Sequence, residues 1–256
     1  MAKKMLITGA SSGIGKSFVD HYKDKYDLIT TARTEKEWIT DPGDITDKEF
    51  RTELIAKHQP NVVINNAGGF RGSFEETYEL NTIAAGHIFE GFYDKMMPYT
   101  HIFNVVSYGI RMYGWQDMSR ERSYYYSSKK AFYEFANNVN MSKNRPVHVV
   151  NLVPGIVKTE MVDADLARRI KINQGHVEEA DLDYYLKENY HRGKIPFHSF
   201  FPIGKEDLPI ISEFIMTLPD YINIDEIVVG MFNKQQLPGK PTTQWGTYGK
   251  RRFQYR

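Results

Sequence analysis

The chain has 256 residues, of which 41% are hydrophobic, enough for one large domain with a substantial core. Its 33 Lys and Arg residues nearly balance its 32 Asp and Glu residues, so the overall charge gives no indication of a nucleic-acid partner. The chain contains no cysteine, which excludes disulfides, thiolate metal ligands and a cysteine nucleophile, and no apolar run approaches the ~20 residues of a membrane span.

Short apolar runs alternate with amphipathic stretches through the first 150 residues, as in a parallel sheet covered by helices. Strands are expected at Lys4–Thr8, Asp27–Thr31, Val62–Asn65, Ile102–Val106 and Val147–Leu152, with helices near 14–24, 47–58, 75–97 and 124–142. A further helix near 205–218 and a strand at 222–229 are expected to return to the sheet. The pattern predicts an α/β fold, a doubly wound parallel sheet (Rossmann fold) in three α/β/α layers, over 1–256 as a single domain. Ligands of such sheets bind beyond the carboxyl ends of the strands.

A glycine-rich turn, Thr8 to Gly15, follows the first strand and opens the first helix. Glycines permit a tight turn and close approach of a pyrophosphate, and a helix N-terminus offers unpaired N–H groups to its charge. The spacing is G-x-x-x-G-x-G, and a glycine turn between a strand and a helix can also be merely structural. Its place after the first strand favours dinucleotide binding by Gly9, Ser11, Ser12, Gly13, Ile14 and Gly15.

The end of the second strand carries Arg33 and no acidic residue between positions 28 and 34. An acidic side chain at this place typically binds the ribose 2′-hydroxyl of NAD, whereas an arginine can accommodate the 2′-phosphate of NADP. The sequence therefore favours NADP(H) over NAD(H). Arg33 could equally be a solvated charge at the end of a strand.

Two polar segments follow the next strand ends. Asp44 and Ile45 lie where the chain should pass the adenine, although Asp44 or Thr46 could instead cap the next helix. The run Asn65 to Gly68 follows an apolar strand directly, and its small residues would let a cofactor approach. The cofactor contacts predicted from both segments are Asp44, Ile45, Asn66, Ala67 and Gly68.

The run Tyr124 to Lys130 contains two Tyr-x-x-x-Lys pairs, Tyr125–Lys129 and Tyr126–Lys130. This spacing puts a phenol and an ammonium on one face of a helix. A free phenol has a pKa near ~10, and a nearby cation lowers it by favouring the phenolate. The segment indicates a proton donor for carbonyl chemistry, and the motif can be read in two frames, with either Tyr125–Lys129 or Tyr126–Lys130 as the functional pair.

These motifs, with Ser107 and the segment Pro154–Thr159, occur in an order that resembles the short-chain dehydrogenase/reductase family over roughly residues 4–160 and weakly over 204–229. The resemblance implies that Ser107 hydrogen-bonds the substrate oxygen and that Asn81 holds a water in a proton relay. The motif lysine would bind the nicotinamide ribose as well as tune the tyrosine. The loop residues Pro154, Gly155, Val157 and Thr159 would receive the nicotinamide carboxamide.

The resemblance also bears on the frame. Family sequences commonly read Tyr-x-x-Ser-Lys-x-Ala, and starting at Tyr125 places Ser128, Lys129 and Ala131 accordingly. The predicted catalytic residues are therefore Asn81, Ser107, Tyr125 and Lys129, and both Tyr125 and Lys129 would also contact the cofactor.

Three features depart from the family pattern. Arg33 and Asp44 are too close in sequence for the usual helix between strands two and three, a shortening that also resembles nucleotide-sugar reductases of the extended branch. Extra residues within Arg111–Ser123 precede the tyrosine, and their aromatic and methionine content favours substrate contact over a plain loop insertion. Residues 160–203 could form a substrate lid. The basic, aromatic extension at 230–256 could be solvated, pack on another subunit or bind substrate phosphate.

The predicted activity is hydride transfer between NADP(H) and a small carbonyl or alcohol substrate, with ketone or aldehyde reduction favoured. The alternatives are a nucleotide-sugar reductase or epimerase and a non-catalytic NADP(H)-sensing regulator. We expect a cytoplasmic homodimer or homotetramer without a nucleic-acid or membrane partner. No metal site is expected, because the eight histidines show no ligand spacing.

Overall fold

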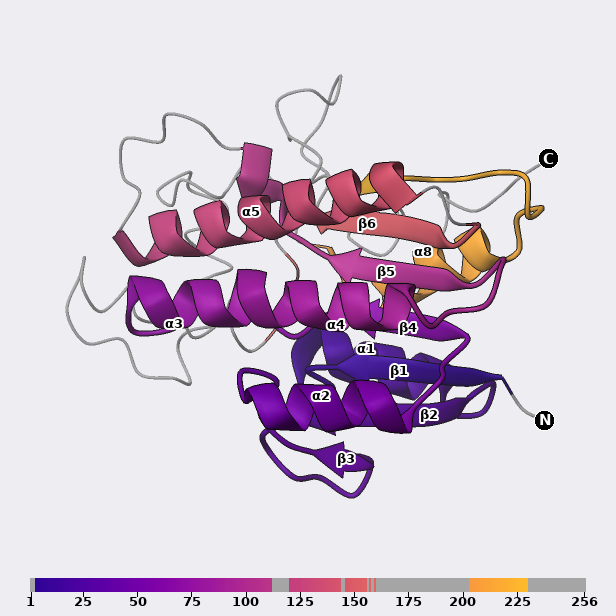
Figure 1. Ribbon diagram of the computed structural model, residues 1–256, viewed down its shortest axis with the longest axis horizontal. Helices are drawn as coiled ribbons and strands as arrows, with labels where there is room; N and C mark the ends of the chain where they lie inside the picture. The colour runs from indigo at the N-terminus through magenta and orange to yellow at the C-terminus, as the bar shows by residue number, and fades with distance from the viewer. Residues whose placement is uncertain are drawn as a thin grey trace, which may run out of the picture.

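The central sheet of the protein is parallel and seven-stranded, in a computed structural model that describes residues 3–111, 120–143, 146–155, 157, 159 and 203–229 (Figure 1). The strand order is β3-β2-β1-β4-β5-β6-β7. The strands are β1 (Lys4–Thr8), β2 (Asp27–Ala32), β3 (Asp41–Pro42), β4 (Val62–Asn65), β5 (His101–Val105), β6 (His148–Pro154) and β7 (Glu226–Val229). The order reverses between β1 and β4, which is the place where doubly wound sheets bind ligands.

Helices cover both faces of this sheet. Helices α2 (Lys48–Lys57), α4 (Ala85–Tyr93) and α5 (Arg120–Lys143) lie on one face, and α1 (Gly13–Tyr22) and α8 (Asp207–Met216) lie on the other (Figure 1). The short helix α3 (Phe74–Tyr78) leads through a π-helical segment, Glu79–Ala84, into α4. The predicted three-layer doubly wound fold is confirmed.

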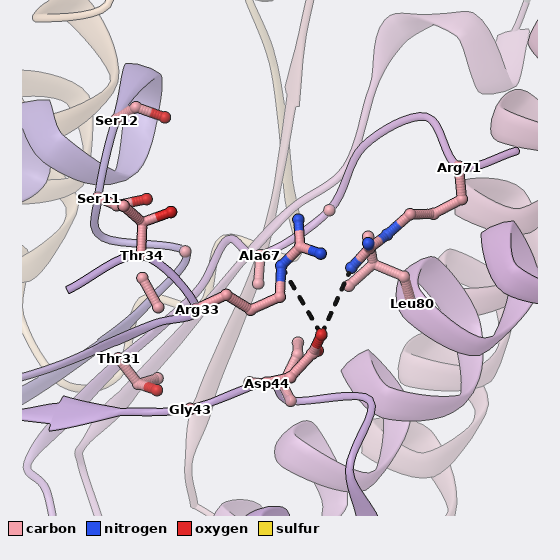
Figure 2. Close-up of a pocket in the computed structure, with 14 residues that line it drawn as sticks. Ser11, Ser12, Thr31, Arg33, Thr34, Gly43, Asp44, Ala67, Arg71 and Leu80 are labelled. Atoms are coloured by element: carbon pink, nitrogen blue, oxygen red, sulfur yellow. Dashed lines mark ion pairs between the residues drawn. The ribbon is translucent and has the colours of Figure 1, made fainter.

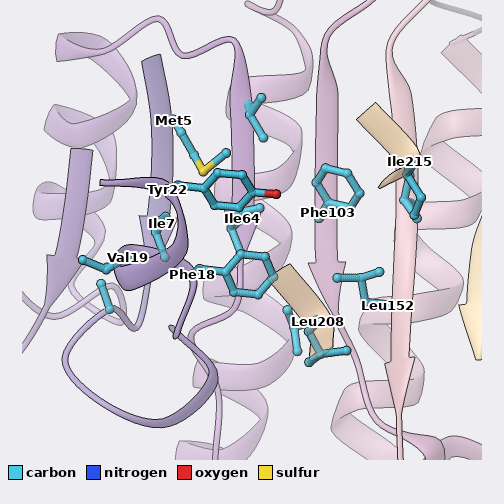
Figure 3. Close-up of a cluster of buried hydrophobic side chains, with 14 of the residues drawn as sticks. Met5, Ile7, Phe18, Val19, Tyr22, Ile64, Phe103, Leu152, Leu208 and Ile215 are labelled. Carbon is cyan, nitrogen blue, oxygen red and sulfur yellow. The ribbon is translucent and has the colours of Figure 1, made fainter. Parts of the chain in front are cut away.

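Alternate residues of the buried strands supply two separate cores. Met5 and Ile7 of β1 face α1 and α8, while Leu6 between them packs with α4 residues on the opposite face. Figure 3 shows the first of these cores, in which the Tyr22 hydroxyl of α1 donates to the Pro209 carbonyl oxygen of α8 at 3.1 Å. Burying each large apolar side chain contributes roughly 1.5–3 kcal/mol. The two cores fix the sheet whose carboxyl edge carries the motifs.

The connection between β2 and β3 contains no helix, as its length predicts. It is held instead by Trp38, whose indole N–H donates to the Ala10 carbonyl oxygen at 3.1 Å, and by Thr40, whose backbone N–H donates to the Thr30 hydroxyl oxygen at 3.0 Å. This compact link leaves the end of β2 open.

Some local details differ from expectation. Helix α2 is capped by Asp47, whose carboxylate accepts from the Glu49 and Phe50 N–H groups, which removes the alternative that Asp44 or Thr46 caps it. The helix expected at 75–97 is interrupted by the π-helical segment and ends at Tyr93. The last described strand begins at Glu226, several residues later than expected.

The expected lid at 160–203 lies outside the described residues except for Ile203, and the C-terminal extension at 230–256 lies wholly outside them. The aromatic and methionine residues of the insertion, at 112–118, also fall outside them. Within the described ranges, none of the helices combines the length and the apolar character needed to span a bilayer.

Candidate active site

The glycine-rich turn after β1 is the tightest part of the site. Gly9 and Gly13 have positive φ angles of 67° and 53°, a backbone conformation that favours glycine. A Cβ on Gly15 would lie 2.1 Å from the Gly9 carbonyl oxygen, so only glycine fits there. Ser12, at the N-cap of α1, makes no side-chain capping hydrogen bond. The N–H groups of the first turn can therefore serve an anionic ligand.

Asn66 joins the end of β4 to this turn. Its amide donates to the Thr8 carbonyl oxygen at 2.9 Å and approaches the Gly9 carbonyl oxygen at 3.3 Å. The Thr8 hydroxyl oxygen in turn accepts from the backbone N–H groups of Asn66 and Ala67, at 3.0 and 2.9 Å. The predicted residue Asn66 thus stabilises the glycine-rich turn through hydrogen bonds to its backbone.

A pocket of about 200 Å³ opens beside this turn, between β2 and β4 (Figure 2). The predicted residues that line it are Gly9, Ser11, Ser12, Arg33, Asp44, Ile45, Ala67 and Gly68. It is also lined by Thr31, Ala32, Thr34, Gly43, Arg71 and Leu80, which sequence reasoning missed. Most of these adjoin predicted positions. Arg71 is the exception, and the only available signal was an isolated arginine three residues beyond Gly68.

Two arginines converge on one carboxylate in this pocket. The Arg33 Nε atom lies 3.7 Å and an Arg71 guanidinium nitrogen 3.8 Å from the Asp44 Oδ2 atom, as the dashed lines in Figure 2 mark. The other carboxylate oxygen of Asp44 accepts from both the backbone N–H and the hydroxyl of Thr46, each at 2.9 Å. The Asp44 carboxylate is therefore held in place from its far side.

The predicted catalytic groups gather at the carboxyl ends of β4 and β5. The Tyr125 hydroxyl is hydrogen-bonded to the Ser107 side chain, and its ring lies on Phe70 with centroids 4.5 Å apart. The neighbouring ring of Tyr126 packs so closely on Gly109 that a Cβ there would lie 2.0 Å from it. The structure thus brings Tyr125 to Ser107 and seats Tyr126 on Gly109.

Burial raises the pKa of Tyr125 to about 12, with a smaller contribution from Tyr126, and the hydrogen bond with Ser107 offsets only part of this rise. The sequence predicted a lowered pKa for the motif tyrosine, because only the effect of a nearby cation was taken into account. Desolvation of the phenolate raises the pKa instead, so Tyr125 stays a neutral phenol at neutral pH.

Lys129 is only 3% exposed and lies one helical turn beyond Tyr125. Its Nζ atom donates to the Val105 carbonyl oxygen at 3.0 Å and lies against Gly68, where a Cβ would be 2.5 Å away. Burial lowers the pKa of Lys129 to about 8. At neutral pH the side chain is still mostly protonated. It is therefore a buried cation beside Gly68, in the loop that follows β4.

The lowered pKa of Lys129 has a consequence for stability. Between pH about 8 and the ordinary lysine pKa of 10.5, the unfolded chain still binds a proton that the folded protein has released. The contribution of Lys129 to the free energy of unfolding therefore increases as the pH rises through this window. Urea unfolding of wild type and Lys129→Met from pH 7.5 to 10 checks this. The stability of wild type relative to the variant should rise with pH, and parallel curves would contradict it.

Asn81 lies in the π-helical segment and is fully buried. Its amide nitrogen donates to the Gly69 carbonyl oxygen at 2.9 Å and to the Ser128 hydroxyl oxygen at 3.1 Å, and its amide oxygen accepts from the Gly69 N–H at 2.9 Å. The side chain therefore ties the loop after β4 to α5. A role in holding a water stays a prediction.

The predicted residues after β6 stand apart from the pocket lining. The Gly155 N–H donates to the Val229 carbonyl oxygen at 2.9 Å, and Val157 forms a β-bridge with Ile203. Thr159 is 7% exposed, and its hydroxyl has no hydrogen-bond partner among the described residues. A buried hydroxyl without a partner is costly, and a polar ligand group would satisfy it.

The residues present fit a dinucleotide. The glycine turn permits close approach, the start of α1 suits a pyrophosphate, and the arginines suit phosphate. The buried hydroxyl of Thr31, which lines the pocket, has no partner in the described part of the chain and could be satisfied by a ligand.

A model of the family described as short chain dehydrogenase matches residues 3–169. The chain belongs to this family, and it is an NAD(P)-dependent oxidoreductase acting on CH–OH groups. No curated protein sequence shows a significant match to it.

Solved structures of similar fold cover nearly the whole chain. The ligand-free aldohexose dehydrogenase of Thermoplasma acidophilum is 15% identical, with a TM-score of 0.72 over 94% of this chain and 97% of that one. The L-sorbose reductase of Gluconobacter frateurii, complexed with NADPH and L-sorbose, is 16% identical, with a TM-score of 0.72 over 92% and 98%. A 4-hydroxyisoleucine dehydrogenase complexed with NADH is 18% identical, with a TM-score of 0.62 over 89% and 96%. At these identities the likeness shows the fold alone.

Proposed function

We propose that the protein uses NADP(H) to reduce a ketone or aldehyde, with Tyr125 as proton donor. The observation that carries the proposal is the meeting of Tyr125, Ser107 and the buried Lys129 at the carboxyl ends of β4 and β5. The frame Tyr125–Lys129 is favoured over Tyr126–Lys130 because Lys129 is the buried lysine and Tyr125 is the tyrosine bonded to Ser107.

The residues divide the work of carbonyl reduction. When bound, the nicotinamide supplies the hydride, and negative charge develops on the substrate oxygen. Ser107 donates a hydrogen bond to that oxygen and Tyr125 gives it a proton. The ammonium of Lys129 stabilises the phenolate that remains on Tyr125. Asn81 keeps the loop after β4 and helix α5 in register for these contacts.

The proposed reductive direction agrees with the protonation state of Tyr125. Its pKa of about 12 keeps the phenol protonated at neutral pH, which is the form needed to give a proton to a carbonyl oxygen. Oxidation of an alcohol needs the phenolate as base and is therefore expected to require higher pH.

The test is oxidation of NADPH, followed at its nicotinamide absorbance, against a panel of carbonyl metabolites that includes ketones, aldehydes and nucleotide sugars. Transfer of deuterium from NADPH labelled at the nicotinamide C4 to the product would support the proposal. Tight NADPH binding without turnover across the panel would contradict it and favour a cofactor-sensing regulator.

The proposed preference for NADP(H) rests on Arg33 at the end of β2, where positions 28–34 carry no acidic residue. Arg33→Ala should weaken NADPH binding by about tenfold or more and change NADH binding little, because an arginine–phosphate contact is bidentate and charge-assisted. Dissociation constants measured by calorimetry for both cofactors check this. Equal losses for the two would remove the argument for 2′-phosphate recognition.

One observation favours a second candidate, a nucleotide-sugar reductase or epimerase. The connection between β2 and β3 lacks the helix usual in the family, and in this respect it resembles the nucleotide-sugar reductases of the extended branch. Protection of residues 234–256 by a nucleotide diphosphate, measured by hydrogen exchange, would support this candidate over a reductase of simple carbonyls.

A further inference from the structure

Arg71 is a charged lining residue of the pocket that the glycine motif does not account for. It follows Gly68 and Gly69 in the loop between β4 and α3, whereas Arg33 comes from the end of β2. Figure 2 shows the two side chains reaching toward Asp44 from opposite walls. Two cations therefore share one carboxylate at the place where a 2′-phosphate would be bound.

The charges of the lining explain why two arginines are needed. Among the lining residues, Arg33 and Arg71 are the cations and Asp44 the anion, which leaves one net positive charge. Without Arg71, the charges of Arg33 and Asp44 would cancel. Asp44 cannot easily turn away, since Thr46 holds its other oxygen with two hydrogen bonds of 2.9 Å. A pocket with no net charge would have little attraction for a 2′-phosphate.

The two arginines are not equivalent. The Arg71 side chain is 22% exposed and that of Arg33 is 58% exposed, so solvent screens the attraction of Arg71 for Asp44 less. Both ion pairs, at 3.7 and 3.8 Å, are longer than a hydrogen bond, so Arg33 can leave Asp44 without losing a directional contact.

We propose that Arg71 determines cofactor specificity by neutralising Asp44, so that Arg33 is free to bind the 2′-phosphate. The proposal rests on the proposed NADP(H) preference. It assigns Arg71 a role through Asp44 and no direct contact with the phosphate.

The first experiment measures binding of two adenosine fragments to the full chain by calorimetry, so that turnover plays no part. Adenosine 2′,5′-bisphosphate carries the 2′-phosphate, and 5′-AMP lacks it. Arg71→Gln should weaken binding of the bisphosphate about three- to tenfold and change 5′-AMP binding less than about twofold. Arg71→Lys should restore most of the affinity. Lys48→Gln, which removes an exposed cation on α2 outside the pocket lining, is the matched charge control.

The second experiment separates neutralisation from direct contact with a double-mutant cycle. Asp44→Asn keeps an oxygen that can accept from Thr46 and should by itself strengthen bisphosphate binding. In the Asp44→Asn background, Arg71→Gln should cost clearly less affinity than it does in wild type, because no carboxylate is left to compete for Arg33 and only the longer-range attraction of the Arg71 charge is lost. Thermal unfolding of every variant checks that the fold is kept.

The outcomes are distinct. If Arg71→Gln binds the bisphosphate as tightly as wild type does, the proposed role of Arg71 is wrong, whereas the NADP(H) preference is unaffected. An equal loss in the wild-type and Asp44→Asn backgrounds would assign Arg71 to the phosphate directly and overturn neutralisation. Equal affinity of the wild type for both fragments would remove the 2′-phosphate site, and with it both this inference and the NADP(H) preference.

Discussion

Tyr125→Phe should lower kcat by at least about a hundredfold while leaving the dissociation constant for NADPH within about threefold of wild type. The substitution removes the hydroxyl that is hydrogen-bonded to Ser107 and keeps the ring that packs on Phe70. The proton donor is thus lost while the surrounding packing is retained. Steady-state NADPH oxidation with any substrate found in the carbonyl panel, together with cofactor titration, measures both effects.

Tyr126→Phe is the matched control, since it also removes one hydroxyl from the adjacent position of α5 and keeps a ring that packs on Gly109. It should retain turnover within about threefold of wild type, because its hydroxyl is not expected to reach the reacting oxygen. A collapse of kcat in Tyr126→Phe with retained activity in Tyr125→Phe would show that the working pair is Tyr126 and Lys130.

Gly68→Ala should cut turnover by about a hundredfold and lower the free energy of unfolding by roughly 1–3 kcal/mol, because the added methyl group overpacks against buried side chains. The added Cβ would lie 2.5 Å from the Lys129 Nζ atom and 2.9 Å from the Asn81 Oδ1 atom. The end of a lysine side chain can move aside at a cost of about 1 kcal/mol, but a displaced ammonium no longer stabilises the phenolate of Tyr125. Urea unfolding and kcat measured on the same preparations separate the two effects.

Gly72→Ala is the control for Gly68→Ala, because it adds the same methyl group to the same loop and meets only the Glu76 carboxylate, at 3.2 Å. It should leave kcat nearly unchanged. A Gly68→Ala variant that keeps wild-type turnover would show that the position of Lys129 against the glycine is not needed for catalysis.

The sequence predicts the sheet well because its strands are short apolar runs that end in residues with a distinctive conformation or size. Lys4–Thr8 and Val62–Asn65 end as predicted, each followed by a motif of the site. Gly9 and Gly15 could be identified because few other residues tolerate their surroundings. The family motif led to Tyr125 and Lys129 through their spacing on one helical face.

Other features depend on distances that no local pattern encodes. Arg71 reaches Asp44 across 27 positions of sequence, and only the fold brings their charges together. The direction of the Tyr125 pKa shift follows mainly from burial, which the local spacing of Tyr125 and Lys129 does not encode. The π-helical segment leaves no signal in composition, and together with α3 and α4 it packs against α5, which is distant in sequence.

That segment makes the site sensitive to chain length in a way that point substitutions do not reveal. Successive residues of an α-helix are turned by about 100°, so deleting one residue within Glu79–Ala84 and restoring regular α-helix would rotate α3 by roughly that angle relative to α4. Phe74 would turn away from Tyr124, against which its ring now packs with centroids 5.4 Å apart, and Asn81 would lose its register with Gly69. Deletion of a single residue of this segment other than Asn81 would therefore uncouple α5 from the loop after β4 while leaving every predicted catalytic side chain in the sequence.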